Sequence, residues 1–209
     1  MTHRPAPARP FPWLAVLGGV AVIVLITVVL LTFGSGGGDT PNQFGDPTIT
    51  GSALPRFNED PANDPAIGLP IPEVQGADFE GDAVSITDDG RPKIIIFLAH
   101  WCSHCQAEVP VVQDWIDAGG KPAGVDVYSV ATSTAETRTN YPPSEWLERE
   151  GWTSPVIVDD TAFSVGDVFG LNAFPYFVFV RADGTVAGRL TGELPPDVIT
   201  QIAQGLTTG

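Results

Sequence analysis

Two cysteines, Cys102 and Cys105, stand three positions apart and are the only cysteines in this chain of 209 residues. Two cysteines are too few for a disulfide scaffold, and a structural bridge closing so short a loop would gain little from chain entropy. A pair at this spacing can instead cycle between a dithiol and a disulfide. The spacing therefore predicts redox chemistry.

The two cysteines are expected to have different roles because of where a helix should begin. A near-continuous apolar run over 93–98 is followed, from Ser103, by a helical pattern. The exposed N–H groups and the dipole at a helix N-terminus lower the pKa of a thiol, so Cys102 is predicted to be the nucleophile. Cys105, one turn later, can attack a mixed disulfide at Cys102 and release the substrate.

The same spacing occurs in zinc sites, which need four ligands. The other ligands at hand, His100 and His104, lie in the same short segment. One strand end and one helical turn could hardly wrap a metal with all four side chains. We expect no metal and no cofactor besides the redox-active Cys102–Cys105 pair, and we expect His100 to be a surface residue without a role.

The elements that must position this pair lie in one domain, residues 74–209, which is long enough for a single core. Asp183-Gly184 is a strong hairpin signal near its end. Strands that alternate with helices and then close with a hairpin predict an α/β fold with a mixed sheet. Strands are predicted over 83–87, 93–98, 125–131, 155–158, 176–180 and 185–190, and helices over 103–118, 144–150, 162–169 and 195–204.

The N-terminal part of the chain predicts an export and membrane arrangement. The apolar run 13–33 is long enough to cross a bilayer as a helix, and Arg4 and Arg9 before it predict that residues 1–12 are cytoplasmic. A cleaved signal peptide is the alternative, although its apolar core would be shorter. Residues 34–73 are rich in Gly, Pro, Asp and Asn, which predicts a flexible stalk. The protein is thus expected in the cell membrane, single-pass, with its C-terminal domain extracytoplasmic.

Charge excludes some partners. After the apolar run the chain carries 8 basic against 25 acidic side chains. A negatively charged surface does not favour binding to nucleic acid, which requires a basic patch, or to anionic lipid head groups. We interpret the excess of acidic side chains as a solvated, soluble surface.

Several motifs in order resemble the thioredoxin superfamily. The segment 99–105 (Ala-His-Trp-Cys-Ser-His-Cys) lies at a strand-to-helix junction, and Pro110 matches the proline inside that superfamily's active-site helix. The run 105–110 (Cys-Gln-Ala-Glu-Val-Pro) resembles the extracytoplasmic TlpA-like branch. Residues 174–176 (Phe-Pro-Tyr) occupy the place of its cis-proline loop, ahead of the closing hairpin. The resemblance spans 74–202 and implies a thioredoxin-like three-layer fold and a thiol-disulfide oxidoreductase.

The resemblance also implies roles for individual residues. Pro175 would be cis, so that the backbone at Phe174 lies beside the cysteines and pairs with a substrate chain. Glu108 would face Cys105 from the next turn and accept its proton. Trp101 would pack beside the site as a lid. His104 would donate a hydrogen bond or positive charge to the Cys102 thiolate.

Two features leave the direction of electron flow open. His104 and Phe174 are typical of the oxidising DsbA-like branch, since the reductases usually carry Thr before the cis-proline. Glu108 and the anchor favour a reductase, for example one that keeps haem-attachment cysteines of apocytochrome c available, and Ile96, where thioredoxin has a buried acid, fits an extracytoplasmic member. A copper chaperone of the Sco type is disfavoured, because its cysteines are one residue further apart and no His follows His104. Expected partners are exported protein thiols and disulfides and a membrane or extracytoplasmic electron donor or acceptor.

Overall fold

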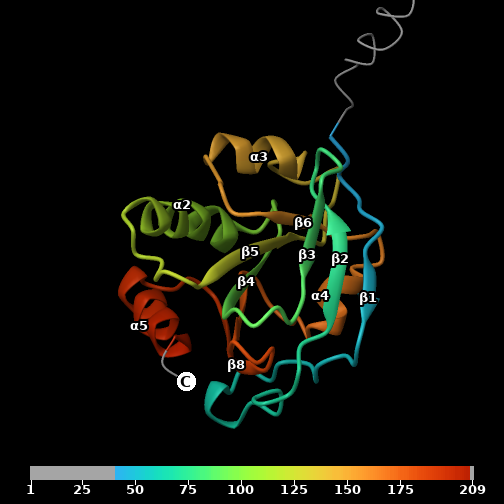
Figure 1. Cartoon of the computed structure of the whole chain (residues 1–209). Helices are drawn as coiled ribbons and strands as arrows, with labels where there is room; N and C mark the ends of the chain where they lie inside the picture. Colours follow the sequence, from blue (N-terminus) through green and yellow to red (C-terminus); the bar gives the residue numbers. More distant parts are fainter. Residues whose placement is uncertain (1–40, 208–209) are drawn as a thin grey trace, which may run out of the picture. The chain divides into compact units, whose positions relative to one another are not determined.

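The structure is a computed structural model that describes residues 41–207. Its centre is a five-stranded sheet with the strand order β6-β5-β4-β7-β8 (Figure 1). The first three of these strands are parallel, whereas β7 is antiparallel to β4 and β8 is antiparallel to β7. The predicted mixed sheet is therefore confirmed. The strands are β4 (Lys93–Leu98), β5 (Asp126–Ala131), β6 (Val156–Val158), β7 (Tyr176–Val180) and β8 (Val186–Thr191).

Two further layers cover the sheet. Helices α2 (Ser103–Asp117), α3 (Pro143–Arg149) and α5 (Pro196–Leu206) supply side chains to the apolar cluster on one face. The other face packs against α4 (Ser164–Val168) and a three-stranded antiparallel sheet of β1 (Thr48–Thr50), β2 (Glu73–Ala77) and β3 (Ala83–Ile86). The fold is the expected three-layer α/β arrangement.

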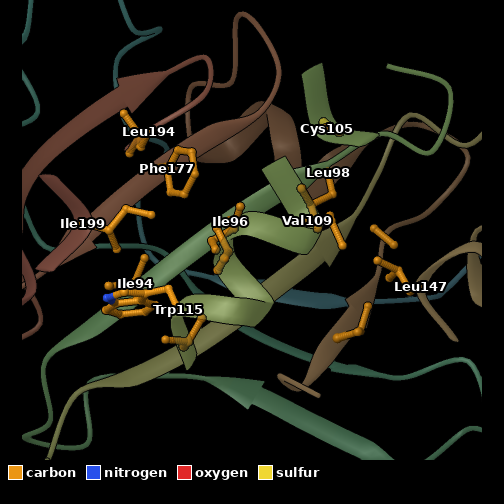
Figure 2. Close-up of a cluster of buried hydrophobic side chains, with 14 of the residues drawn as sticks. Ile94, Ile96, Leu98, Cys105, Val109, Trp115, Leu147, Phe177, Leu194 and Ile199 are labelled. Atoms are coloured by element: carbon orange, nitrogen blue, oxygen red, sulfur yellow. The ribbon is translucent and has the colours of Figure 1, made fainter. Parts of the chain in front are cut away.

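Strand β4 is buried along its whole length, which explains why every residue after Lys93 is apolar. Because side chains alternate across a strand, Ile94, Ile96 and Leu98 pack toward α2 (Figure 2), while Ile95 and Phe97 pack toward α4. Cys105 belongs to the first of these clusters. The dithiol thus follows a strand that is buried along its whole length.

The segment 41–73 is folded, so the predicted flexible stalk over 34–73 is wrong for these residues. Strand β1 pairs with β2, and a short 3-10 helix, η1 (Pro61–Asn63), follows. Leu54, Phe57 and Ile71 are buried against the face of the sheet opposite α2. These few apolar side chains are widely spaced in the sequence, but each buries a large apolar surface when it packs against the sheet. The folded domain therefore begins well before Val74.

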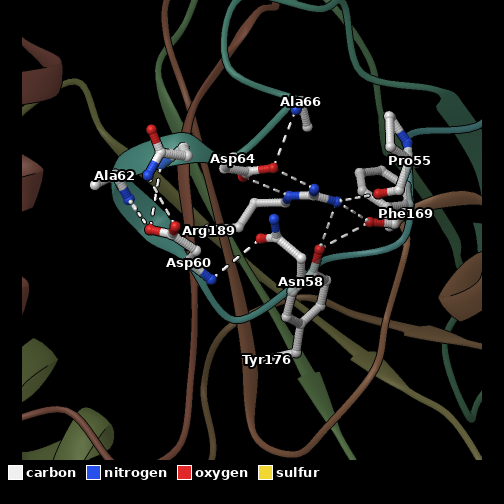
Figure 3. Close-up of polar contacts among 10 residues, drawn as sticks. Pro55, Asn58, Asp60, Ala62, Asp64, Ala66, Phe169, Tyr176 and Arg189 are labelled. Atoms are coloured by element: carbon white, nitrogen blue, oxygen red, sulfur yellow. Dashed lines mark hydrogen bonds and ion pairs between the residues drawn. The ribbon is translucent and has the colours of Figure 1, made fainter.

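A buried ion pair ties this segment to the sheet (Figure 3). The side chains of Arg189 on β8 and Asp64 are fully buried and pair through two hydrogen bonds, one of them from Nε to Oδ2 at 2.8 Å. Arg189 Nη1 also donates to the carbonyl of Pro55 at 2.8 Å and to the hydroxyl of Tyr176 at 3.0 Å. Burial alone would raise the pKa of Asp64, but the hydrogen bonds from Arg189 and Ala66 bring it below its ordinary value.

The predicted cytoplasmic residues 1–12, the anchor 13–33 and the first residues of the predicted stalk lie outside the described residues. Within 41–207, no helix combines the length and the apolar character that a membrane span needs.

Candidate active site

Cys102 lies at the junction between the central strand and helix α2, as the sequence predicts. It is the residue that precedes the helix, and its carbonyl accepts the first helical hydrogen bond from the Gln106 N–H at 3.0 Å. Its own N–H donates to the Ala99 carbonyl at 3.0 Å, which fixes the turn after β4. The thiol is free and only partly buried. Cys102 can therefore be approached from outside.

Cys105 lies one turn further along α2 and is fully buried. Its sulfur accepts a long hydrogen bond from the Ala99 N–H at 3.5 Å. Burial strongly raises the pKa of the Cys105 thiol, and the neighbouring Cys102 and the charge of Glu108 raise it further. The buried thiol is inert as an external nucleophile and needs a base before it can react.

Glu108 occupies the next turn of the same helix and is 1% exposed. Both carboxyl oxygens accept the N–H of Leu194, at 3.2 and 3.1 Å. Burial raises the pKa of Glu108 to about 7, and the nearby charge of Glu193 acts in the same direction. A carboxyl group with this pKa can both accept and return a proton at neutral pH, close enough to influence the thiol of Cys105.

The Phe174–Pro175 peptide bond is cis, as the resemblance implies. The Phe174 carbonyl lies 3.9 Å from the Cys102 sulfur, and the Pro175 carbonyl accepts the Gly192 N–H at 2.9 Å. The cis-proline loop thus lies directly beside the attacking thiol.

Trp101 is held in place on two sides. Its indole N–H donates to the Ser133 carbonyl at 2.8 Å. The Phe174 ring meets it edge to face at 5.9 Å, and the guanidinium of Arg138 lies 4.8 Å from its ring centre. Trp101 packs beside the site, as expected, and links the cis-proline loop to the residues after β5.

His104 differs from the expectation. Its imidazole Nδ1 lies 2.7 Å from a carboxyl oxygen of Glu193, and both side chains are largely exposed. In the structure the ring therefore bonds to Glu193, not to the Cys102 sulfur. The sequence offers no hint of this pairing, because the two residues are 89 positions apart.

The prediction that His100 is a surface residue is wrong, because its side chain is buried and the residue is 1% exposed. Its Nδ1 lies 2.7 Å from the Thr139 carbonyl, and the Ala135 N–H lies 3.1 Å from Nε2. A carbonyl only accepts and a backbone N–H only donates, so the ring is neutral and protonated on Nδ1. Burial lowers the pKa of His100. The signal for its burial is its position directly after a strand whose residues are all buried.

Among the residues that the structure describes, no three or more His, Cys, Asp or Glu side chains are grouped so that they could hold a metal ion.

The fold and the site define a thioredoxin-like protein with a Cys-x-x-Cys motif at the start of its active-site helix. The family model of the thioredoxin-like domain matches residues 79–206, and the chain belongs to that family. The implied membership of the thioredoxin superfamily is thereby confirmed.

A curated relative and two solved structures are similar to the chain. It is 26% identical over 121 residues to the thiol-disulfide oxidoreductase ResA of Oceanobacillus iheyensis, a match that spans 57% of this chain and 60% of the relative. A thiol:disulfide interchange protein of Chlorobium tepidum shares the fold with a TM-score of 0.55 at 21% identity, over 66% of this chain and 96% of that one. A secreted disulfide oxidoreductase of Mycobacterium tuberculosis does so with a TM-score of 0.52 at 20% identity, over 63% and 95%.

Proposed function

We propose that the protein is a thiol-disulfide oxidoreductase that acts on exported proteins through Cys102 and Cys105. One observation carries the proposal: a free, accessible thiol at the start of α2 lies 3.9 Å from the carbonyl of Phe174 before the cis-proline, with a second, buried thiol one turn away. This arrangement lets a substrate chain pair beside the attacking sulfur.

The geometry supports a two-step exchange. The Cys102 thiolate attacks one sulfur of a substrate disulfide, forms a mixed disulfide and releases the first substrate thiol. The ionised Glu108 carboxylate then takes the proton of Cys105, whose thiolate attacks the Cys102 sulfur. A Cys102–Cys105 disulfide forms and the second substrate thiol leaves. Two electrons and two protons pass from the dithiol to the substrate, and an external dithiol must reset the site.

The direction that the site supports best is reduction. A His beside the nucleophile favours an oxidant when it stabilises the thiolate. Here the His104 ring bonds to the Glu193 carboxylate instead, and Glu108 is poised as a base for the resolving thiol. A disulfide oxidase or isomerase is the second candidate, and the identity of Phe174 before the cis-proline is the observation that favours it.

The cellular setting is also part of the proposal. The uncharged run 13–33 and the two arginines before it support a single-pass anchor with residues 1–12 in the cytoplasm. The domain then works outside the cytoplasm, where it draws electrons from a membrane or extracytoplasmic donor. Haem-attachment cysteines of apocytochrome c are one suitable class of substrate.

Reduction of insulin by dithiothreitol tests the activity. The full chain should accelerate the reaction, and Cys102→Ser should abolish the acceleration because it removes the attacking sulfur. A Cys102→Ser variant as fast as the wild type would rule out the proposed nucleophile.

A further inference from the structure

The segment 133–141 connects β5 to α3 and contains neither helix nor strand. We refer to it as the β5–α3 loop. Ser133 and Asn140, near its two ends, have positive φ angles of 55° and 58°. Left-handed backbone is unfavourable for residues with a Cβ and persists where surrounding contacts impose it. Contacts with neighbouring residues must therefore hold this loop in its conformation.

The side chain of His100 supplies two of these contacts. One ring nitrogen donates to the Thr139 carbonyl at 2.7 Å, and the other accepts the Ala135 N–H at 3.1 Å. The His100 carbonyl is fixed in turn by the side-chain amide of Gln106 on α2, at 2.9 Å. Both nitrogens of a buried ring are thus used to join the loop to the cysteine segment, and a ring of the same shape without nitrogens would remove both hydrogen bonds, to the Thr139 carbonyl and from the Ala135 N–H.

The β5–α3 loop presents side chains next to the dithiol. The adjacent Trp101 donates to the Ser133 carbonyl at 2.8 Å, and Arg138 lies over its ring. Tyr141 packs its ring edge against His100 at 6.0 Å and remains 37% exposed. Arg138 over Trp101 and the partly exposed Tyr141 against His100 are therefore the surface that this loop adds to the cysteine segment. A substrate must be large to reach this surface while its disulfide lies at the attacking sulfur.

We infer that His100 is a positioning residue for protein substrates: it holds the β5–α3 loop so that Arg138 and Tyr141 contact the polypeptide that flanks the substrate disulfide. The inference rests on the proposed exchange at Cys102 and Cys105, in which His100 neither gains nor loses a proton or an electron. A small disulfide makes no contact with the loop, so only substrates with a polypeptide chain depend on His100.

The test compares two substrates for the full chain in mild detergent, with insulin as the protein disulfide and bis(2-hydroxyethyl) disulfide as the small one. In His100→Phe the KM for insulin should rise about tenfold while kcat stays within twofold. The rate with the small disulfide and the reduction potential should not change. His100→Asn, which keeps a donor for the Thr139 carbonyl, should recover part of the KM.

Two further measurements keep the test decisive if His100→Phe folds poorly. Arg138→Ala, at an exposed position, should raise the KM for insulin severalfold and leave the small disulfide unaffected. Its control is Arg56→Ala, which removes the same charge from another exposed position, in the segment 41–73. Hydrogen exchange at the Ala135 amide should be at least tenfold faster in His100→Asn or His100→Phe.

An unchanged KM for insulin in both His100→Phe and Arg138→Ala, or equal losses with both substrates, would overturn the inference. A wild-type chain that reduces neither substrate would instead overturn the proposed function itself.

Discussion

Replacement of Glu108 by Gln should slow the resolving step and at the same time remove a pH-dependent loss of stability. Glu108 is 1% exposed, and burial raises its pKa to about 7 from an ordinary value of 4.5. Gln keeps the shape of the side chain and a carbonyl oxygen for the Leu194 N–H, which the carboxylate accepts at 3.1 and 3.2 Å. The Gln amide neither gains nor loses a proton at any relevant pH, so it cannot act as a base.

The effect on stability has a defined sign. A carboxyl group with a raised pKa in the folded state stabilises fully below its unfolded pKa, and that contribution is lost as pH rises through the folded pKa. Between pH 5 and pH 8 the ionisation of Glu108 should therefore lower the stability of the wild type by about 2–3 kcal/mol, a loss that Glu108→Gln does not show. The buried Gln amide group costs about 1–3 kcal/mol at every pH, so the informative quantity is the change with pH.

The effect on rate follows from the high pKa of the buried Cys105 thiol, which needs a base. Loss of a general base costs about 10²–10⁴-fold, and we expect a loss near 100-fold in the resolving step. Reaction with Ellman's reagent measures this step directly. Attack by Cys102 releases the first thionitrobenzoate, and attack by Cys105 on the mixed disulfide releases the second.

Asp114→Asn is the matched control, since it removes a carboxylate from an exposed position on the same helix. It should change neither the second release nor the pH dependence of stability, measured by urea unfolding at pH 5 and pH 8. A second release within threefold of wild type in Glu108→Gln, or a stability difference that does not vary with pH, would refute the role assigned to Glu108.

Three other predictions concern the fold and the site. Asp64→Asn should lower the free energy of unfolding by about 3–5 kcal/mol, because Arg189 is left buried and unpaired; a loss below 1 kcal/mol in urea unfolding would contradict this. Cys105→Ser should accumulate a mixed disulfide at Cys102, visible by mass spectrometry, and its absence would argue against a resolving role. Burial lowers the pKa of His100 below its ordinary value of about 6.5, so the ring keeps its acceptor nitrogen above that pH and the KM for insulin should be constant from about pH 6.5 to pH 8; a KM that rises as pH falls within this range would contradict it.

The sequence identifies the elements whose signals are local. Strands 93–98 and 176–180 are nearly all apolar, because both faces of the sheet are covered, and they occupy the predicted residues. The hairpin at Asp183-Gly184 follows from turn chemistry. Cys102 and Pro175 lie where the motifs predict.

What the sequence does not reveal depends on contacts between distant residues. Leu54 and Phe57 are too sparse to form a periodic pattern, and they are buried only because the sheet offers them a surface. The ion pair of Asp64 with Arg189 joins residues 125 positions apart. His100 is buried by a loop that carries no regular pattern.

The reduction potential of the Cys102–Cys105 pair tests the central claim most directly. The full chain would be equilibrated with glutathione or dithiothreitol buffers and followed by the fluorescence of Trp101 beside the dithiol. We expect a reversible two-electron couple at about −250 mV or lower, near the value of about −270 mV for thioredoxin. A value of about −120 to −180 mV, typical of oxidants and isomerases, would contradict the reductase direction, and the absence of a reversible couple would contradict the redox function itself.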